Sequence, residues 1–216
     1  MTTDLTLFET IQGSHVWGMQ TDKSDIDIFR CYLSHNNDML LGKSPLSWEE
    51  HSLSPQMTTA SHEMGAVVDQ LLVKNNINYY LAILSPYVHI SNYGILERLR
   101  EIALRGMSKK AYASIHGMAQ QNFMKYVATE SDVSKKRLNT ICRNLQFGIN
   151  YLREQKIVFK PFYEGSETAI TSLMKELDLA REESTLPEEP PIVIKNEADA
   201  FILEIRKKYG DYDGHT

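Results

Sequence analysis

Residues 13–27 read GSHVWGMQTDKSDID, a stretch that opens with a Gly-Ser pair and closes with an Asp-Ile-Asp triplet. Successive side chains of a β-strand point to opposite faces, so Asp25 and Asp27 would share one face. Two carboxylates that close repel each other and raise each other's pKa unless solvent or a cation neutralises them. Magnesium is the natural counter-ion, because it binds carboxylate oxygens, water and phosphates. This end of the stretch therefore predicts a divalent-metal site.

The Gly-Ser pair predicts the other half of such a site. Gly13 lets the backbone approach a phosphate closely, and Ser14 offers a hydroxyl and a backbone N–H. Each half alone has an ordinary explanation, since Gly-Ser is a common turn dipeptide and an exposed Asp pair is usually solvated. The flanks favour a site, because residues 5–11 are typical of a strand or short element, 26–33 of the next strand, and 21–24 of a turn. Together the two halves indicate nucleotidyl transfer, in which two metal ions clamp the reacting oxygens.

The stretch 13–27 resembles the signature of the DNA polymerase beta superfamily of nucleotidyltransferases. The second glycine, Gly18, and the Ser-Asp before the second acid resemble the branch of that superfamily associated with RNA repair. Residues 62–86 also resemble that branch, as do the segments around 108–112 and 137–143. The likeness covers most of the chain, although only the first motif is specific.

The activity that this resemblance implies is transfer of a nucleoside monophosphate from a nucleoside triphosphate to an acceptor hydroxyl, with release of pyrophosphate. By the same resemblance, Gly13 and Ser14 would hold the triphosphate, and Asp25 and Asp27 would bind Mg²⁺ or Mn²⁺. The acceptor stays open between an RNA end, a small alcohol and a protein hydroxyl.

The family pattern also includes a third carboxylate on a later strand, which helps to activate the acceptor hydroxyl. The strand expected near residues 55–61 contains no acid. Glu63 is the nearest substitute as a metal ligand and catalytic residue, and Asp69 follows on a predicted helix. Glu63 has a second interpretation, because an acid in the first turn of a helix stabilises its dipole and Ser61 could cap that helix. If the third acid is missing, the alternative is a module of this fold that binds nucleotides or RNA without catalysis.

Triphosphate binding needs cations beyond the metals, and three side chains are candidates. His15 adjoins the Gly-Ser pair, Lys23 lies in the turn before the acids, and Arg143 follows Cys142 on an otherwise apolar helical stripe. A guanidinium near a buried face needs an anionic partner, either substrate phosphate or a structural acid. Trp17 is predicted to lie in the core rather than to stack on a base. The remaining basic residues of the helical half are predicted to be solvated: Lys109, Lys110, Lys125, Lys135, Lys136 and Arg137.

The pattern of apolar residues changes near residue 91 and predicts an α+β fold. Residues 1–90 would form a nucleotidyltransferase-type mixed β-sheet with flanking helices, and residues 91–216 a C-terminal helical bundle. Gly106 is a plausible helix stop, residues 184–191 predict a linker, and a last helix is expected over 196–209. Four stripes at helical spacing support the bundle: Ile95, Leu96, Leu99, Ile102 and Ala103; Tyr112, Ile115, Ala119, Phe123 and Tyr126; Leu138, Ile141, Cys142, Leu145, Ile149 and Leu152; and Ile170, Leu173, Met174 and Leu177.

Composition is compatible with an enzyme. A chain of 216 residues with 42% hydrophobic content is long enough for a substantial core. It contains no run of about 18 apolar residues and no basic and apolar leader, so we expect a cytosolic protein without a membrane span. Cys31 and Cys142 suit reduced core residues better than a disulfide or zinc site. The net charge is −5, so any RNA acceptor would need a local basic patch.

Overall fold

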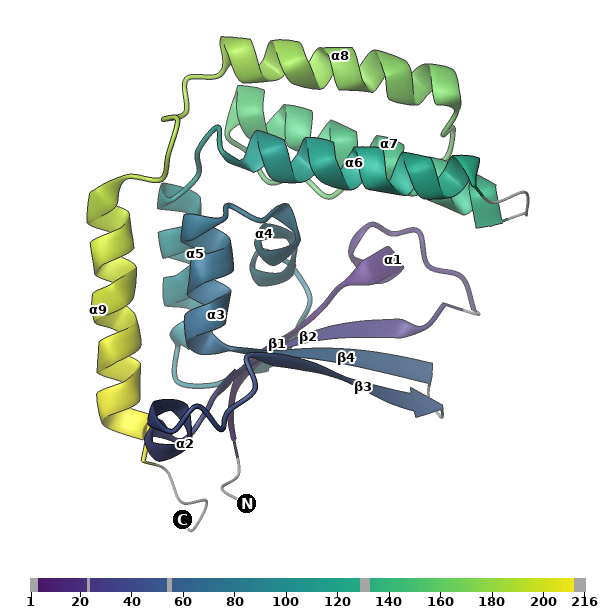
Figure 1. The fold of residues 1–216 in the computed structure, drawn as a ribbon. Coiled ribbons are helices and arrows are strands. Elements are labelled where there is room, and N and C mark those ends of the chain that lie inside the picture. The colour runs from purple at the N-terminus through teal and green to yellow at the C-terminus, as the bar shows by residue number, and fades with distance from the viewer. Residues whose placement is uncertain (1–3, 23, 54–55, 129–132, 212–216) are drawn as a thin grey trace.

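The computed structural model describes residues 4–22, 24–53, 56–128 and 133–211 (Figure 1). Its described strands form one mixed sheet of five strands in the order β3-β4-β2-β1-β5. β2 and β4 run parallel, and the other three pairs are antiparallel. The predicted strands on either side of the Gly-Ser motif are thereby confirmed. The strands are β1 (Leu5–Ile11), β2 (Ile26–Leu33), β3 (Ser47–Leu53), β4 (Gln56–Glu63) and β5 (Val88–Ser91).

Alternation along β2 decides which side chains face the helices. Phe29 is buried against Tyr79 of α4 (Ile77–Ile83), with the ring centroids 5.7 Å apart. Arg30 points to the opposite face of the sheet, where its Nε lies 2.6 Å from Glu9 Oε1. Asp27 is two residues before Phe29, so its side chain lies on the helix-covered face.

The helices form two layers above this face (Figure 1). The first layer contains α3, α4 and α5, and the second contains α6, α7 and α8. Short helices α1 and α2 follow β1 and β2, and α3 continues into a π-helical turn, η1. The remaining bounds are α1 (Gly13–Val16), α2 (Asn36–Leu40), α3 (Met64–Val68), η1 (Asp69–Val73), α5 (Ile95–Arg105), α6 (Ala111–Val127), α7 (Val133–Glu154), α8 (Glu167–Glu183) and α9 (Ile192–Tyr209).

The helical predictions are confirmed element by element. Each of the four apolar stripes lies on one of the helices α5 to α8. Gly106 caps the end of α5, as expected for a helix stop. A single hydrophobic cluster joins the sheet to these helices, and within it the rings of Tyr80 and Tyr151 meet edge to face at 5.6 Å. The mixed sheet with flanking helices, followed by further helices, is therefore the observed fold.

The last helix does not join the bundle of α6, α7 and α8. After the linker at 184–191, α9 returns to the first layer and contacts α3 and α5. Arg206 of α9 forms an ion pair with Glu63 at the end of β4. The predicted boundary between residues 90 and 91 falls inside β5.

Both cysteines are free and buried, as the sequence predicts. Burial raises the pKa of Cys31 well above its ordinary value, so this side chain stays a neutral thiol. Within the described ranges, the helices are all too short or too polar to cross a lipid bilayer.

Candidate active site

The loop from β1 into α1 holds Gly13 against Asp27. The backbone N–H of Gln12 donates a hydrogen bond of 2.7 Å to the Asp27 carbonyl oxygen, which ties the loop to β2. Gly13 adopts a left-handed φ of +64°, and a Cβ at this position would lie 1.9 Å from Asp27 Oδ2. The Gly13 backbone is therefore in direct contact with the Asp27 carboxylate, and any larger residue at position 13 would collide with that carboxylate.

Asp25 and Asp27 form the acidic pair that the sequence predicts. Asp25 directly precedes β2, and Asp27 is half-buried within it. Burial raises the pKa of Asp27, and the charge of Asp25 raises it further. The charges of His15 and Lys136 lower it. The two carboxylates therefore repel each other in a partly buried environment, and a bound cation would relieve this repulsion.

These residues fit a magnesium or manganese ion that substrate helps to hold. No group of three or more His, Cys, Asp and Glu side chains that could hold a metal occurs in the part of the chain that the structure describes. Magnesium is usually bound by one or two carboxylates, with water and substrate phosphates completing its coordination. The pair Asp25 and Asp27, beside a glycine loop that a phosphate can approach, matches that requirement.

The start of α7 brings a lysine to this pair. Lys136 is exposed to solvent, as predicted, yet its charge lowers the pKa of Asp27. It lies seven residues before Arg143, so both side chains fall on one face of the helix. That spacing was the signal by which the sequence could have placed Lys136 in the site.

Arg143 lies behind the Gly13 loop without an acidic partner. Its guanidinium carbon is 4.4 Å from the centroid of the Trp17 ring. Its Nε is buried without a hydrogen bond, its Nη1 lies 4.0 Å from Met19 Sδ, and it forms no ion pair with the described residues. Burial lowers the pKa of Arg143 to about 10. Of the two partners that the sequence allows, the structural acid is therefore not found.

A cavity of about 190 Å³ adjoins Arg143. Trp17 forms part of its wall and is only 4% exposed, which confirms its predicted place in the core. The lining residues come from the Gly13 loop, α4, α7 and the segment after α7: Gln12, Gly13, Val16, Trp17, Asn78, Leu81, Arg143, Asn144 and Phe159.

Comparison with protein families identifies the family of the chain. The model of the RNA repair pathway DNA polymerase beta family matches residues 4–200. The chain belongs to this family. The match confirms the resemblance to the nucleotidyltransferases of the DNA polymerase beta superfamily. No curated protein matches the chain.

The residue opposite Asp27 is not the third carboxylate that the resemblance predicts. The parallel register of β2 and β4 pairs Asp27 with Thr58, not with an acid. The antiparallel register of β3 and β4 pairs Thr58 with His51, and His51 Nδ1 lies 3.1 Å from Thr58 Oγ1. The place beside Asp27 therefore holds a hydroxyl and an imidazole.

The structure contradicts the prediction that Glu63 supplies the third carboxylate. Glu63 pairs with Tyr32, five residues further along β4 than Thr58, which is about 16 Å at 3.3 Å per residue. An odd number of residues also turns it to the opposite face of the sheet. Its carboxylate instead accepts a hydrogen bond of 2.7 Å from Gly65 N–H and pairs with Arg206. The helix-capping interpretation is confirmed, with Glu63 rather than Ser61 as the cap of α3.

The two remaining candidates are Asp69 and Lys23. Asp69 begins η1 and lines a different cavity, between η1 and α9. Lys23, predicted to contact phosphate, is outside the residues that the structure describes. Neither adds a described contact to Asp25 and Asp27.

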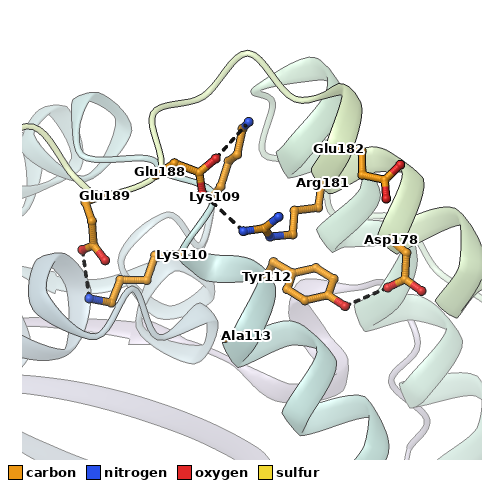
Figure 2. A pocket seen from close by; sticks show the side chains of 9 residues that line it. All are labelled: Lys109, Lys110, Tyr112, Ala113, Asp178, Arg181, Glu182, Glu188 and Glu189. Carbon is orange, nitrogen blue, oxygen red and sulfur yellow. Dashed lines mark hydrogen bonds and ion pairs between the residues drawn. The ribbon is translucent and has the colours of Figure 1, made fainter.

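The largest of the described cavities is elsewhere and carries no comparable chemistry (Figure 2). It measures about 610 Å³ and lies between the start of α6, the end of α8 and the linker before α9. Its lysines are already neutralised: Lys109 Nζ lies 3.2 Å from Glu188 Oε1, and Lys110 Nζ lies 2.9 Å from Glu189 Oε2. Since its cations are paired, size alone does not favour this cavity over the Gly13 site.

Proposed function

We propose that this chain is a nucleotidyltransferase that uses Mg²⁺ or Mn²⁺ to transfer a nucleoside monophosphate from a nucleoside triphosphate to an acceptor hydroxyl. The observation that carries the proposal is the direct contact between the Gly13 backbone and the Asp27 carboxylate. A phosphate held at Gly13 and Ser14 would lie beside any cation bound by Asp25 and Asp27. Membership of the RNA repair pathway DNA polymerase beta family supports this reading.

Each residue of the site has a role in the proposal. The backbone of Gly13 and the hydroxyl and N–H of Ser14 would bind triphosphate oxygens. Asp25 and Asp27 would hold the metal ions, which when bound neutralise the phosphates and polarise the reacting bond. Lys136 places positive charge near Asp27, His15 would add to it when protonated, and both would then counter the charge of the triphosphate. Lys23 stays a proposed phosphate contact.

With Thr58 beside Asp27, most of the catalytic effect would come from alignment and electrostatic stabilisation. The chain would orient the acceptor hydroxyl rather than deprotonate it with a third carboxylate. We propose an RNA end as acceptor, which the family's description favours over a small alcohol or a protein hydroxyl. A cytosolic location remains our proposal too, and the free, buried thiols of Cys31 and Cys142 suit a reducing compartment.

A second candidate function follows from the same strand register. Thr58 in place of an acid favours a module that binds nucleotide or RNA without turning it over. Both candidates predict metal-dependent binding of triphosphate, but only the first predicts release of pyrophosphate.

The test is to incubate the protein with each nucleoside triphosphate, Mg²⁺ or Mn²⁺ and a pool of short RNAs, and to measure pyrophosphate beside the Asp27→Asn variant. Release that is lost in the variant would support the transferase. Metal-dependent triphosphate binding without release would support the binding module. Undiminished binding in both the Asp25→Asn and Asp27→Asn variants would refute the site itself.

A further inference from the structure

Two buried polar atoms of residues that line the cavity beside Arg143 lack hydrogen-bond partners, although Arg143 Nη1 lies 4.0 Å from Met19 Sδ. Arg143 Nε–H is a donor, and Asn144 Oδ1 is an acceptor; both atoms are shielded from solvent and form no hydrogen bond. Asn144 is 6% exposed, and its Nδ2 is turned toward Met118 Sδ at 3.8 Å. Buried polar groups are normally satisfied, and each one left unpaired lowers stability. The cavity therefore suits a ligand that supplies both an acceptor and a donor.

The need for both an acceptor and a donor distinguishes the phosphate of a nucleotide from its base. An ionised phosphate offers only acceptors, so it would satisfy Arg143 and leave the Asn144 carbonyl unpaired. The edge of a nucleobase offers an acceptor next to a donor. The cavity walls also suit a flat, largely apolar ring, because they include Val16, Trp17 and Phe159. With a pKa of about 10, Arg143 stays protonated at neutral pH and donates.

The position of the cavity agrees with a base whose phosphates lie at the proposed site. Gly13 lines the cavity and also contacts Asp27, so one loop borders both places. Lys136, near Asp27, and Arg143 are seven residues apart on α7, or about 10.5 Å at 1.5 Å per residue. α1 lies between the sheet and α7, with α4 beside it (Figure 1). A nucleotide with its phosphates between Gly13 and Lys136 can therefore direct its base toward Arg143.

We propose that this cavity holds the base of the nucleoside triphosphate and that Arg143 and Asn144 select guanine. Arginine donates most effectively to O6 and N7 of guanine, and the adjacent N1–H would donate to Asn144 Oδ1. Adenine has an amino group where guanine has O6. That amino group and the Arg143 guanidinium are both donors, so they cannot hydrogen-bond to each other. This inference rests on the proposed function, because it requires a nucleotide bound at Gly13.

The test measures binding by calorimetry, with Mg²⁺ present, of GTP, ATP and inorganic tripolyphosphate to the full chain and to two variants. Arg143→Met removes the proposed base contact. Arg153→Met is the matched control, because Arg153 lies on the same helix and pairs with Glu176 and Glu183. We expect GTP to bind about tenfold to a hundredfold tighter than ATP. Arg143→Met should abolish that preference and leave tripolyphosphate binding unchanged, and Arg153→Met should change neither.

Base analogues test the same contacts in the unaltered protein, which avoids dependence on the folding of Arg143→Met. Inosine triphosphate keeps O6, N1–H and N7 and should bind like GTP. The triphosphate of 2-aminopurine riboside lacks O6 and N1–H and should bind like ATP.

Three results would overturn the inference. Equal affinity of the unaltered protein for GTP and ATP would show that the cavity does not read the base. A loss of tripolyphosphate affinity in Arg143→Met as large as the loss for GTP would assign Arg143 to phosphate. If neither nucleotide nor tripolyphosphate binds the unaltered protein, the proposed function fails together with the inference. Retained tripolyphosphate binding without base preference overturns the inference alone.

Discussion

Thr58 lies directly opposite Asp27 in the parallel register of β2 and β4, on the face of the sheet that the helices cover. Neighbouring strands are about 4.8 Å apart, so a carboxylate at position 58 would lie beside the acidic pair. Because the side chains at Asp27 and Thr58 share a face, the position can receive a third metal-binding group without any change of fold.

Thr58→Asp is therefore expected to strengthen metal binding. Without metal, three acids in one place repel each other and should lower the unfolding temperature. With Mn²⁺, we expect about tenfold tighter binding, and hence a larger rise in unfolding temperature with metal concentration. Calorimetric titration of Mn²⁺ checks this, with Thr58→Asn as the neutral control. Equal Mn²⁺ affinity in the Asp and Asn variants would contradict the placement of the metal.

Gly13→Ala should abolish metal-dependent binding of triphosphate. Its Cβ would lie 1.9 Å from Asp27 Oδ2, so the loop or the carboxylate must move. A left-handed φ adds a cost of about 1–3 kcal/mol for a residue with a Cβ. Gly18→Ala is the matched control, because Gly18 has the same φ of +64° but no heavy atom within 4 Å of the added Cβ.

Comparison of the two alanine variants separates backbone strain from the contact with Asp27. Both should lose similar stability through φ, measured by chemical denaturation. Only Gly13→Ala should also lose affinity for tripolyphosphate with Mg²⁺. If the two variants bind tripolyphosphate equally well, the Gly13 loop is not the phosphate site.

Much of the fold and part of the site could be predicted because their signals are local. A period of two at the start of β2 predicts that Asp25, just before the strand, and Asp27 share a face, and a period near 3.6 predicts the apolar faces of α5 to α8. Gly13 was identified by its spacing from the acids. These inferences need only the neighbouring sequence, and the structure agrees with the strands and helices that they predict.

The remaining features depend on how distant elements pair. Glu63 was a reasonable third acid by sequence distance, but the β2–β4 register, which local sequence does not specify, pairs Thr58 with Asp27 instead. Lys136 has the sequence of a solvated helix face. Its spacing from Arg143 places the two on one face of α7, but the docking of that face against the Gly13 loop, which brings its charge near Asp27, depends on distant contacts. The return of α9 to Glu63 likewise follows from contacts between residues far apart in the chain.

Removal of the Asp27 carboxylate should change how the unfolding temperature depends on pH. Burial and Asp25 raise the pKa of Asp27 above its value in the unfolded chain. Stability is therefore greatest when Asp27 is protonated, and it falls as pH rises through the folded-state pKa. In metal-free buffer at pH 7, Asp27→Asn should unfold about 1–3 °C above the unaltered protein, because the asparagine carries no charge.

This difference should disappear below about pH 3, where Asp27 is protonated in both the folded and unfolded chains. Thermal unfolding between pH 3 and pH 8 measures it, with EDTA present to remove metal. Addition of Mn²⁺ at pH 7 should reverse the order, since only the unaltered protein keeps both carboxylates. A difference that does not vary with pH would show that repulsion between Asp25 and Asp27 is not its cause.

Glu63→Gln tests whether Glu63 is structural, as its contacts indicate. The side chain is fully buried and pairs with Arg206, so loss of its charge leaves the guanidinium with only two neutral acceptors among the described residues, Ser34 O and Asn36 Oδ1. We expect a loss of about 3 kcal/mol in the free energy of unfolding, since removal of one member of a buried ion pair is costly. Gln can still accept the hydrogen bond from Gly65 N–H, so α3 keeps its cap. Arg206→Met should cause a loss at least as large, because it leaves the fully buried Glu63 carboxylate charged, with the hydrogen bond from Gly65 N–H but no cation beside it. At a temperature where each variant is folded, both should bind Mn²⁺ and triphosphate like the unaltered protein. Weakened metal binding in folded Glu63→Gln, with normal binding in Arg206→Met, would instead assign Glu63 to the metal site.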